Sequence, residues 1–265
     1  MPLNIPGALI PFHLLVNPRL ILPSIAQDIR QLDFPALKRA GYRGAVFDKD
    51  NCLTIPHRDG LVRELTECWK ECHETFGEGN VLVVSNSAGS HLDAGEIQAE
   101  AVSHALSVPV LRHASPKPSY ACIASIRAYF ASLPAPVRDA ELIVVGDRLM
   151  TDVVLANRMA RYRSSSSPHR NAASEQENEG KENGPAGRTG PLAVWTTSIW
   201  KREGLVVRAI EQGILRGVER WIAHKGDQPS KELSRFVKMP PKADMHQEKE
   251  GILRRWLGKI RLGKA

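Results

Sequence analysis

Two aspartates follow a short apolar run in this chain of 265 residues. The run Gly44–Phe47 predicts a buried strand, and Asp48 and Asp50 come directly after it. Extended backbone places side chains i and i+2 on the same side, so these carboxylates should lie close together. Like charges at that separation need a cation, and a hard, oxygen-seeking ion such as Mg²⁺ would relieve their repulsion. Taken alone, the pair is equally compatible with a turn or a calcium loop.

Polar side chains also follow three later apolar runs. They are Ser85 and Asn86 after 80–84, Lys117 after 108–111, and Asp147 and Asp152 after 142–145. Ser85 and Asp147 have an ordinary alternative as helix caps, and Lys117 has one as a solvated loop lysine. The small residues after Ser85 predict a helix whose free N–H groups would favour phosphate. The polar residues occur in order at successive strand ends, which favours one shared site over separate roles as caps or loop residues.

The elements that must position these residues alternate along the chain. Predicted strands are 44–47, 80–84, 108–111, 142–145 and 192–195, and predicted helices are 61–76, 89–101, 119–133 and 150–159. Continuous apolar strands separated by helices predict an α/β fold, a Rossmann-like parallel five-stranded sheet with helices on both faces. Chemistry in such sheets collects at the carboxyl ends of the strands. The predicted elements fill the intervals between Thr54, Ser85 and Lys117, so we expect no cap domain and an open site suited to a large phosphate carrier.

Three regions are predicted along the chain. Residues 1–35 are apolar and proline-rich, 36–222 form the catalytic domain, and 223–265 form a basic tail. Prolines break the first region too often for a membrane-spanning helix, so it packs on the domain core or lies in a membrane interface. The interval 163–190 is almost without apolar residues and predicts a disordered insertion. The four cysteines lack zinc spacing and are interpreted as reduced, buried fillers.

Basic residues concentrate toward the C-terminus. Residues 196–265 contain 16 Lys and Arg against 8 Asp and Glu, which indicates an anionic partner such as a membrane, a nucleic acid or an acidic protein. Apolar spacing over 205–222 predicts an amphipathic helix, most simply one packed on the sheet. The basic, Trp-bearing end at 251–265 is typical of an interfacial anchor, with a frayed tail or an oligomer contact as alternatives. No basic, aromatic-rich stripe is evident, so no nucleic-acid partner is expected.

Three segments carry a family resemblance. FDKDNCLT at 47–54, VVSNSAGS at 83–90 and GDRLMTDVVLANRMA at 146–160 resemble the motifs of the haloacid dehalogenase (HAD) superfamily of phosphohydrolases. More closely, they resemble the mitochondrial phosphatidylglycerophosphate phosphatases of fungi, as do residues 3–7 and 16–18 near the start of the chain. The resemblance extends to about residue 220 and weakens over 163–190 and the last forty residues.

The resemblance implies a role for each matching residue. Asp48 would attack phosphorus and form an aspartyl phosphate, and Asp50 would protonate the leaving alcohol and then activate water. Ser85 would bind the phosphoryl oxygens, and Lys117 would offset their charge. The Mg²⁺ ligands would be Asp48, Asp147 and the Asp50 backbone carbonyl, with Asp152 as an auxiliary ligand. Lys49, Asn51 and Asn86 would line the phosphate pocket.

The implied activity is hydrolysis of phosphatidylglycerophosphate to phosphatidylglycerol and phosphate, a step of cardiolipin synthesis. The protein would act on an anionic phospholipid as a peripheral protein on the matrix side of the mitochondrial inner membrane, and a homo-oligomer is left open. The alternative is a phosphatase of this superfamily acting on nucleic-acid ends or on a soluble phosphometabolite. A non-catalytic scaffold is disfavoured because every catalytic position is filled.

Overall fold

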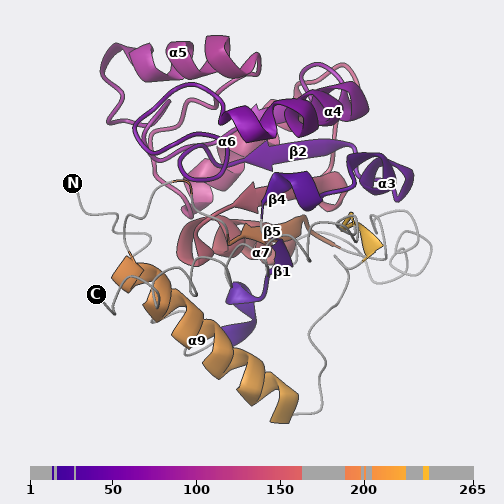
Figure 1. The fold of residues 1–265 in the computed structure, drawn as a ribbon, viewed down its shortest axis with the longest axis vertical. Coiled ribbons are helices and arrows are strands. Elements are labelled where there is room, and N and C mark those ends of the chain that lie inside the picture. Colours follow the sequence, from indigo (N-terminus) through magenta and orange to yellow (C-terminus); the bar gives the residue numbers. More distant parts are fainter. Residues whose placement is uncertain are drawn as a thin grey trace, which may run out of the picture.

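A parallel sheet forms the centre of the molecule (Figure 1). The computed structural model describes residues 14, 17–26, 28–162, 189–197, 200, 205–224 and 235–238. The strands lie in the order β1-β5-β4-β2-β3, and every adjacent pair is parallel. Their bounds are β1 Ser24–Ala26, β2 Gly44–Phe47, β3 Val81–Val83, β4 Leu142–Gly146 and β5 Leu192–Thr196. The predicted α/β class with a parallel sheet and flanking helices is therefore confirmed.

Helices cover both faces of the sheet because the strands are apolar on both sides. The first face packs against α3 (Phe34–Arg39), α4 (Thr66–Phe76) and α5 (Ile97–Leu106). The opposite face packs against α6 (Tyr120–Ala131), α7 (Val154–Tyr162) and α9 (Leu205–His224). Alternate residues of one strand serve the two faces: in β2, Ala45 and Phe47 belong to the first core and Val46 to the second.

Four of the five predicted strands are present in this sheet, but the strand predicted at 108–111 is wrong. That segment makes only an isolated parallel bridge, between Val110 and Val83. Two backbone hydrogen bonds hold it, from Val83 N to Pro109 O at 3.0 Å and from Leu111 N to Val83 O at 2.8 Å. Pro109 has no N–H to donate, so the ladder cannot extend as a regular strand.

The remaining strand of the sheet, β1, was not predicted. Ser24–Ala26 lies in the proline-rich region and pairs with β5, with Ala26 opposite Thr196. Ile21, Ile29 and Leu32 around it are fully buried. A strand of three residues bounded by proline is too short for periodicity to reveal.

The helix predicted at 89–101 is also misplaced. The chain after β3 runs as a loop, with a short 3₁₀ turn at Ala94–Glu96, and α5 begins only at Ile97. The Asp93 carboxylate accepts hydrogen bonds from the amides of Gly89, Gln98 and Ala99, which fixes this loop against the start of α5. Left-handed backbone at Gly95 and Glu96 separates the 3₁₀ turn from α5. Helices at 66–76, 120–131, 154–162 and 205–224 match their predicted positions, and the cysteines are free and buried as expected.

Several predictions fall on other parts of the chain. Residues 163–188 of the insertion predicted at 163–190, the amphipathic end at 251–265 and residues 1–13 lie outside the described residues. Among the described residues, no helix has the length and apolar character needed to cross a bilayer.

Candidate active site

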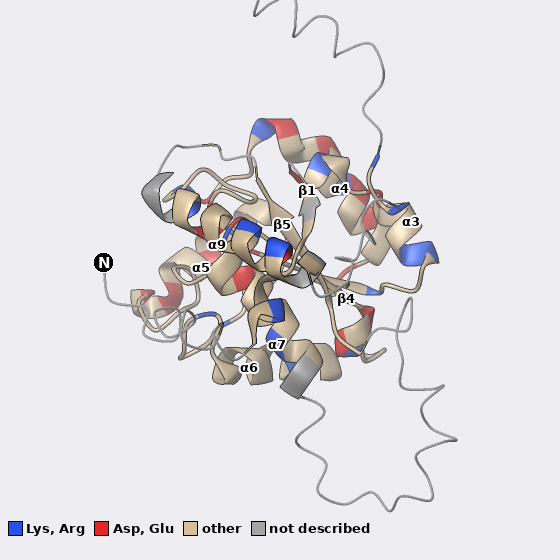
Figure 2. Ribbon diagram, turned by 90° about the horizontal axis from the view of Figure 1, so that it is seen from below, with Lys and Arg blue, Asp and Glu red and all other residues tan. Residues whose placement is uncertain are grey.

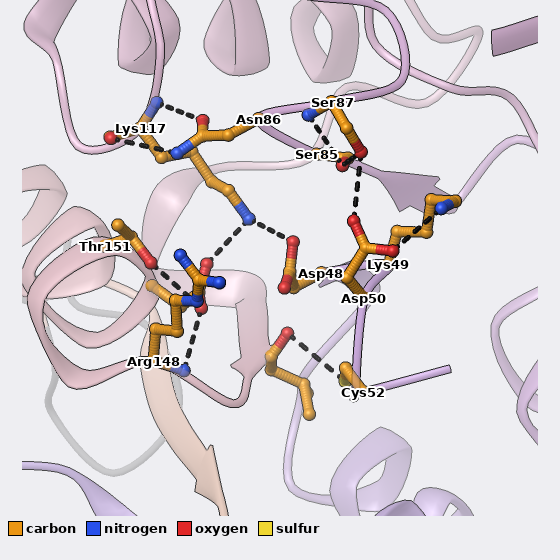
Figure 3. A network of polar contacts seen from close by, with 12 residues as sticks. Asp48, Lys49, Asp50, Cys52, Ser85, Asn86, Ser87, Lys117, Arg148 and Thr151 are labelled. Atoms are coloured by element: carbon orange, nitrogen blue, oxygen red, sulfur yellow. Dashed lines mark hydrogen bonds and ion pairs between the residues drawn. The ribbon is translucent and has the colours of Figure 1, made fainter. Parts of the chain in front are cut away.

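The candidate site is formed by loops at the carboxyl ends of β2, β3 and β4 together with the segment that carries Lys117. Figure 3 shows Asp48, Asp50, Ser85, Asn86 and Lys117 in this region. Register explains why: Phe47 of β2 pairs with Val83 of β3 and with Val145 of β4, so all three strands end at one level. The Asp48 amide extends the ladder by donating to Val145 O at 2.8 Å. The residues after these strand ends therefore enter one site.

Lys117 lies at the centre of the site. Its Nζ is 2.6 Å from Asp48 Oδ1 and 2.7 Å from Asp152 Oδ1, and all three side chains are buried. Burial alone would lower the pKa of Lys117, but Asp152 and Asp48 outweigh it and raise that pKa. Burial also raises the pKa of Asp48, to about 6, with the Asp152 and Asp50 charges adding to the rise and Lys117 opposing it. One cation thus neutralises only part of the charge of the acidic groups.

Asp147 joins these two carboxylates to form an acidic cluster of Asp48, Asp147 and Asp152. One ligand atom from each of the three lies within 4.8 Å of the others. Asp147 Oδ1 is buried and has no hydrogen-bond partner. Burial, followed by the Asp48 and Asp152 charges, raises the pKa of Asp147 well above its usual value. Convergent carboxylates with an unsatisfied buried oxygen match the ligand preference of a hard divalent cation.

Gly146 makes room for this cluster. A Cβ at that position would collide with the Asp152 carboxyl group, so only glycine allows Asp152 to lie against the end of β4. Asp152 is then fixed by donors: Arg148 N and Thr151 Oγ1 each lie 3.2 Å from its Oδ2, opposite the Lys117 contact at Oδ1. The single-turn π-helix Leu149–Val153 turns Asp152 back into the site, a geometry often seen at functional positions.

Asp50 occupies a second, separate polar cluster. Its carboxylate accepts from Lys49 Nζ at 2.8 Å, Ser87 Oγ at 3.0 Å and His57 N at 3.2 Å. Burial raises the pKa of Asp50, but the bonds from Lys49 and Ser87 outweigh it and leave the pKa below its usual value. The Asp50 carboxylate therefore lies outside the acidic cluster. The predicted Mg²⁺ ligand from this residue is its backbone carbonyl, so the position of the carboxylate does not test that prediction. Lys49, expected in the phosphate pocket, is bonded to Asp50 and is almost fully buried.

The loop after β3 supplies hydroxyls instead of a helix end. Ser85 Oγ lies 2.9 Å from Ser87 Oγ and accepts from Ser87 N at 3.1 Å. Because α5 starts only at Ile97, the prediction that a helix N-terminus would meet phosphate directly after Ser85 is wrong. The hydroxyls of Ser85 and Ser87 and the local backbone replace it.

Asn86 positions Lys117. Its Oδ1 accepts from Lys117 N at 2.6 Å, and its Nδ2 donates to Lys117 O at 3.3 Å, so one amide side chain holds both backbone groups of the lysine. Figure 3 shows this pair, with the Lys117 side chain extending toward Asp48. His113 adds a second link, since its ring nitrogens lie 2.9 Å from Ser85 O and 2.7 Å from Ser115 O.

Asn51 has a clear backbone role. Its φ of 60° is in the left-handed region, which asparagine adopts more easily than most residues. Its N–H donates to Thr54 O, and the amides of Leu53 and Thr54 both donate to Lys49 O. The motif thus folds into a tight turn that places Asp48 and Asp50 in different clusters.

Three residues that shape the site were not predicted from the sequence. Trp195 Nε1 and Arg208 Nη2 both donate to Asp147 O, at 2.8 and 3.1 Å, and Glu211 Oε1 accepts from Met150 N at 3.2 Å. They come from β5 and α9, far along the chain. Arg208 and Glu211 are polar residues on the inner side of an amphipathic helix, a pattern too general to assign them to a site, and Trp195 lies within an apolar strand.

Replacing Asp147 by asparagine should change stability and metal response in opposite directions. Without a divalent cation, removing one buried like charge should leave the free energy of unfolding unchanged or higher. The increase in melting temperature that we expect on Mg²⁺ binding should largely disappear. Thermal unfolding with EDTA and with Mg²⁺ measures both effects, and Asp139→Asn, a buried carboxylate paired with Arg127 outside this cluster, is the control. An unchanged Mg²⁺ response would show that Asp147 is not a ligand.

The parallel α/β sheet, with an acidic cluster, a buried lysine and hydroxyls at adjacent strand ends, is the arrangement of the HAD superfamily of phosphohydrolases. The family model described as "Mitochondrial PGP phosphatase" matches residues 5–165. The chain belongs to this family.

Curated relatives agree with that assignment. The protein named phosphatidylglycerophosphatase GEP4, mitochondrial, of Saccharomyces cerevisiae is 36% identical over 160 residues, which cover 60% of this chain and 85% of the relative. Phosphatidylglycerophosphate phosphatase 1, chloroplastic, of Chlamydomonas reinhardtii is 44% identical over 144 residues, 54% of this chain. The Arabidopsis thaliana protein named as chloroplastic/mitochondrial is 30% identical over 247 residues, 90% of this chain. The matches cover 51% of the algal relative and 60% of the Arabidopsis one. No solved structure matches the chain.

Proposed function

We propose that this protein is a Mg²⁺-dependent phosphatase that hydrolyses phosphatidylglycerophosphate to phosphatidylglycerol and phosphate. The observation that carries the proposal is the buried cluster of Asp48, Asp147 and Asp152, in which Asp48 and Asp152 contact Lys117, in a chain of this family. Phosphoryl transfer depends mainly on positioning and on neutralising charge, and the site offers a carboxylate nucleophile beside a fixed cation.

Asp48 is the proposed nucleophile. Its carboxylate would form a bond to phosphorus as the bond to the lipid glycerol oxygen breaks, which leaves an aspartyl phosphate. Water would then cleave that acyl phosphate and regenerate Asp48. The hydrogen bond between Lys117 Nζ and Asp48 Oδ1 supports the assignment, because it fixes the direction in which the other oxygen points.

Asp50 is the proposed acid and base. It would donate a proton to the departing glycerol oxygen and take a proton from the attacking water in the second step. The second role is supported by its surroundings, since the donors Lys49 and Ser87 favour the ionised carboxylate. Ser87, which bonds both Asp50 and Ser85, is a candidate link between the acid/base group and the phosphate-binding hydroxyl.

Ser85 and Lys117 are the proposed phosphoryl ligands. The Ser85 hydroxyl would donate to a phosphoryl oxygen, and Lys117 would offset the charge that develops on the group. Asn86 would act by holding the Lys117 backbone, a revision of its predicted place in the phosphate pocket. Asp48 and Asp147, with Asp152 nearby, would hold Mg²⁺, which would supply positive charge to the phosphoryl oxygens when bound.

We further propose that the site lacks a cap domain. The support is that residues 48–117 are all described, and their helices α4 and α5 contribute buried residues to the core instead of forming a separate unit. An open site admits a phosphate group carried by a lipid in a bilayer. Peripheral association with the matrix side of the mitochondrial inner membrane is proposed from the family and the yeast relative's name.

A substrate panel tests this function. The purified chain should be assayed with Mg²⁺ against phosphatidylglycerophosphate in mixed micelles, a 5′-phosphorylated oligonucleotide, sugar phosphates and a small aryl phosphate. We expect kcat/KM for the lipid to exceed that for every soluble substrate by at least about 100-fold, because only the lipid presents its phosphate on a surface. Equal or faster turnover of the oligonucleotide or a sugar phosphate would contradict the proposal, and EDTA should abolish all activity.

A further inference from the structure

Helix α9 has an inner face committed to the active site. Glu211 and Leu215 are buried, and Glu211 accepts a hydrogen bond from Met150 N. Arg208, one turn earlier, donates to the carbonyls of Asp147 and Thr196. The helix is thereby fixed to the loop that carries Asp147.

The outer face of the same helix has a different character. The side chains of Ile210 and Trp221 are 55% and 45% exposed and lie on the same side of the helix, three turns apart. The exposed residues of α9 that the structure describes are Ala209, Ile210, Gly213, Arg216, Gly217, Arg220, Trp221 and His224. None of them is acidic. Figure 2 views the molecule from the side on which α9 lies and shows basic segments along this helix.

We infer that this outer face, defined by Ile210, Arg216, Arg220 and Trp221, binds the anionic surface of a lipid bilayer. The inference rests on the proposed function, which places the substrate phosphate on an anionic phospholipid. Arg216 and Arg220 are exposed while Glu219 beside them is half-buried, and this excess of exposed positive charge matches a negatively charged surface. Tryptophan and isoleucine on the same side suit shallow insertion at the headgroup boundary.

A second copy of this chain fits the face less well. Two-fold packing of α9 against itself around Gly217 would bring Arg216 and Arg220 of both helices together, four positive charges against the two half-buried Glu219 side chains. Gly213 and Gly217 have open space where a Cβ would stand, so they permit close approach of a helix but do not require it. Charge therefore favours a membrane over a second copy.

The position of α9 would set the distance between the bilayer and the acidic cluster. The helix separates the Asp147 loop from its own outer face by about one helix diameter, roughly 10 Å. A bilayer bound to the outer face would hold the acidic cluster at a fixed height above the headgroups. A terminal phosphate on a glycerol headgroup extends toward that level, whereas the acyl chains stay in the bilayer.

Vesicle binding by the full-length protein and surface variants tests the inference. Probes are vesicles of neutral phosphatidylcholine alone and with 30% phosphatidylglycerol, in cosedimentation. Arg216→Gln/Arg220→Gln should lower partitioning to the anionic vesicles by roughly 25-fold, at about fivefold per basic residue near the surface. Ile210→Gln/Trp221→Gln should lower it by about tenfold or more. The matched control is Leu92→Gln/Ile97→Gln, two exposed apolar residues at and before α5, which should bind like the wild type.

Two further variants separate the alternatives. Gly217→Leu blocks close helix pairing, so it should leave vesicle binding intact, and the oligomeric state should be the same in all variants. Loss of a dimer in the α9 variants, with vesicle binding unchanged, would make this face a self-association surface and overturn the inference. Loss of binding with Trp256→Gln but with neither α9 double variant would assign the contact to the C-terminal tail instead, and would overturn it equally.

Activity measurements keep the two proposals distinguishable. In the α9 variants, kcat/KM for the lipid in vesicles should fall with binding, while hydrolysis of a small aryl phosphate stays within twofold of the wild type. If the wild type fails to hydrolyse the lipid in micelles but its vesicle binding depends on α9, the proposed function is wrong and the inference that α9 binds the bilayer is supported. If the wild type hydrolyses the lipid and both α9 double variants bind vesicles normally, the inference about α9 is wrong while the proposed function is supported.

Discussion

Replacing Asp48 by asparagine is expected to lower the rate of phosphate release by on the order of 10⁴-fold or more. A carboxamide is a poor nucleophile, and the substitution also removes one of the three carboxylates in the acidic cluster. The measurement is single-turnover phosphate release from an aryl phosphate, with acid quenching to detect an aspartyl phosphate. The wild type should show the acid-stable, hydroxylamine-sensitive phosphoenzyme, and the variant should show none.

Folding of the Asp48 variant must be shown separately. Its melting temperature in EDTA should be at least that of the wild type, because burial raises the pKa of Asp48 and asparagine carries no charge to bury. Asp139→Asn, which alters a buried ion pair with Arg127, should keep turnover within about threefold. Residual turnover of the Asp48 variant above a few per cent would exclude this residue as the nucleophile.

Replacing Lys117 by methionine is expected to damage both stability and catalysis. The stem of the side chain is retained, but Asp48 and Asp152 lose the cation that lies 2.6 and 2.7 Å from them. Breaking a buried ion pair on one side costs about 3–5 kcal/mol in the free energy of unfolding. Removing one charge from a phosphoryl site should lower kcat by about 10²- to 10³-fold.

Denaturant unfolding with and without Mg²⁺ checks the Lys117 prediction. A divalent cation should restore part of the lost stability, since it can neutralise the same carboxylates, but it should not restore kcat. Lys38→Met, which removes a lysine bonded to Thr75 O on the surface, should alter neither quantity by much. A Lys117 variant with turnover within tenfold of the wild type would contradict its place at the phosphoryl group.

Much of the fold could be predicted because its strands are continuous apolar runs. β2, β4 and β5 stand out in the sequence since both faces of the sheet are covered, and polar residues of the site follow β2 and β4. β1 could not be found this way, because three residues that directly follow Pro23 are too few to show periodicity. The segment 108–111 looked like a strand by composition, yet the missing N–H of Pro109 limits it to a bridge.

For the candidate site, the sequence predicted which residues meet but not which atoms they contact. Residue types and order predicted that Asp48, Ser85, Lys117 and Asp147 would meet, because strand ends of a parallel sheet share one edge. Side-chain partners could not be predicted, since they depend on turns and rotamers. The Asn51 turn that separates Asp50 from Asp48, and the Asn86 amide that holds Lys117, became visible only in three dimensions.

Pro109 has a consequence for association between molecules. A sheet edge with free N–H and C=O groups can pair with another chain and start aggregation. Here the edge beyond β3 is occupied by a segment with a proline at its centre, and Val108 O accepts from Ser103 Oγ of α5 at 2.7 Å. Pro109 limits this segment to a single bridge, and the Val108 carbonyl is already occupied, so the exposed edge is short. A short edge is a poor template for edge-to-edge pairing, a useful property for a protein that would be concentrated on a membrane surface.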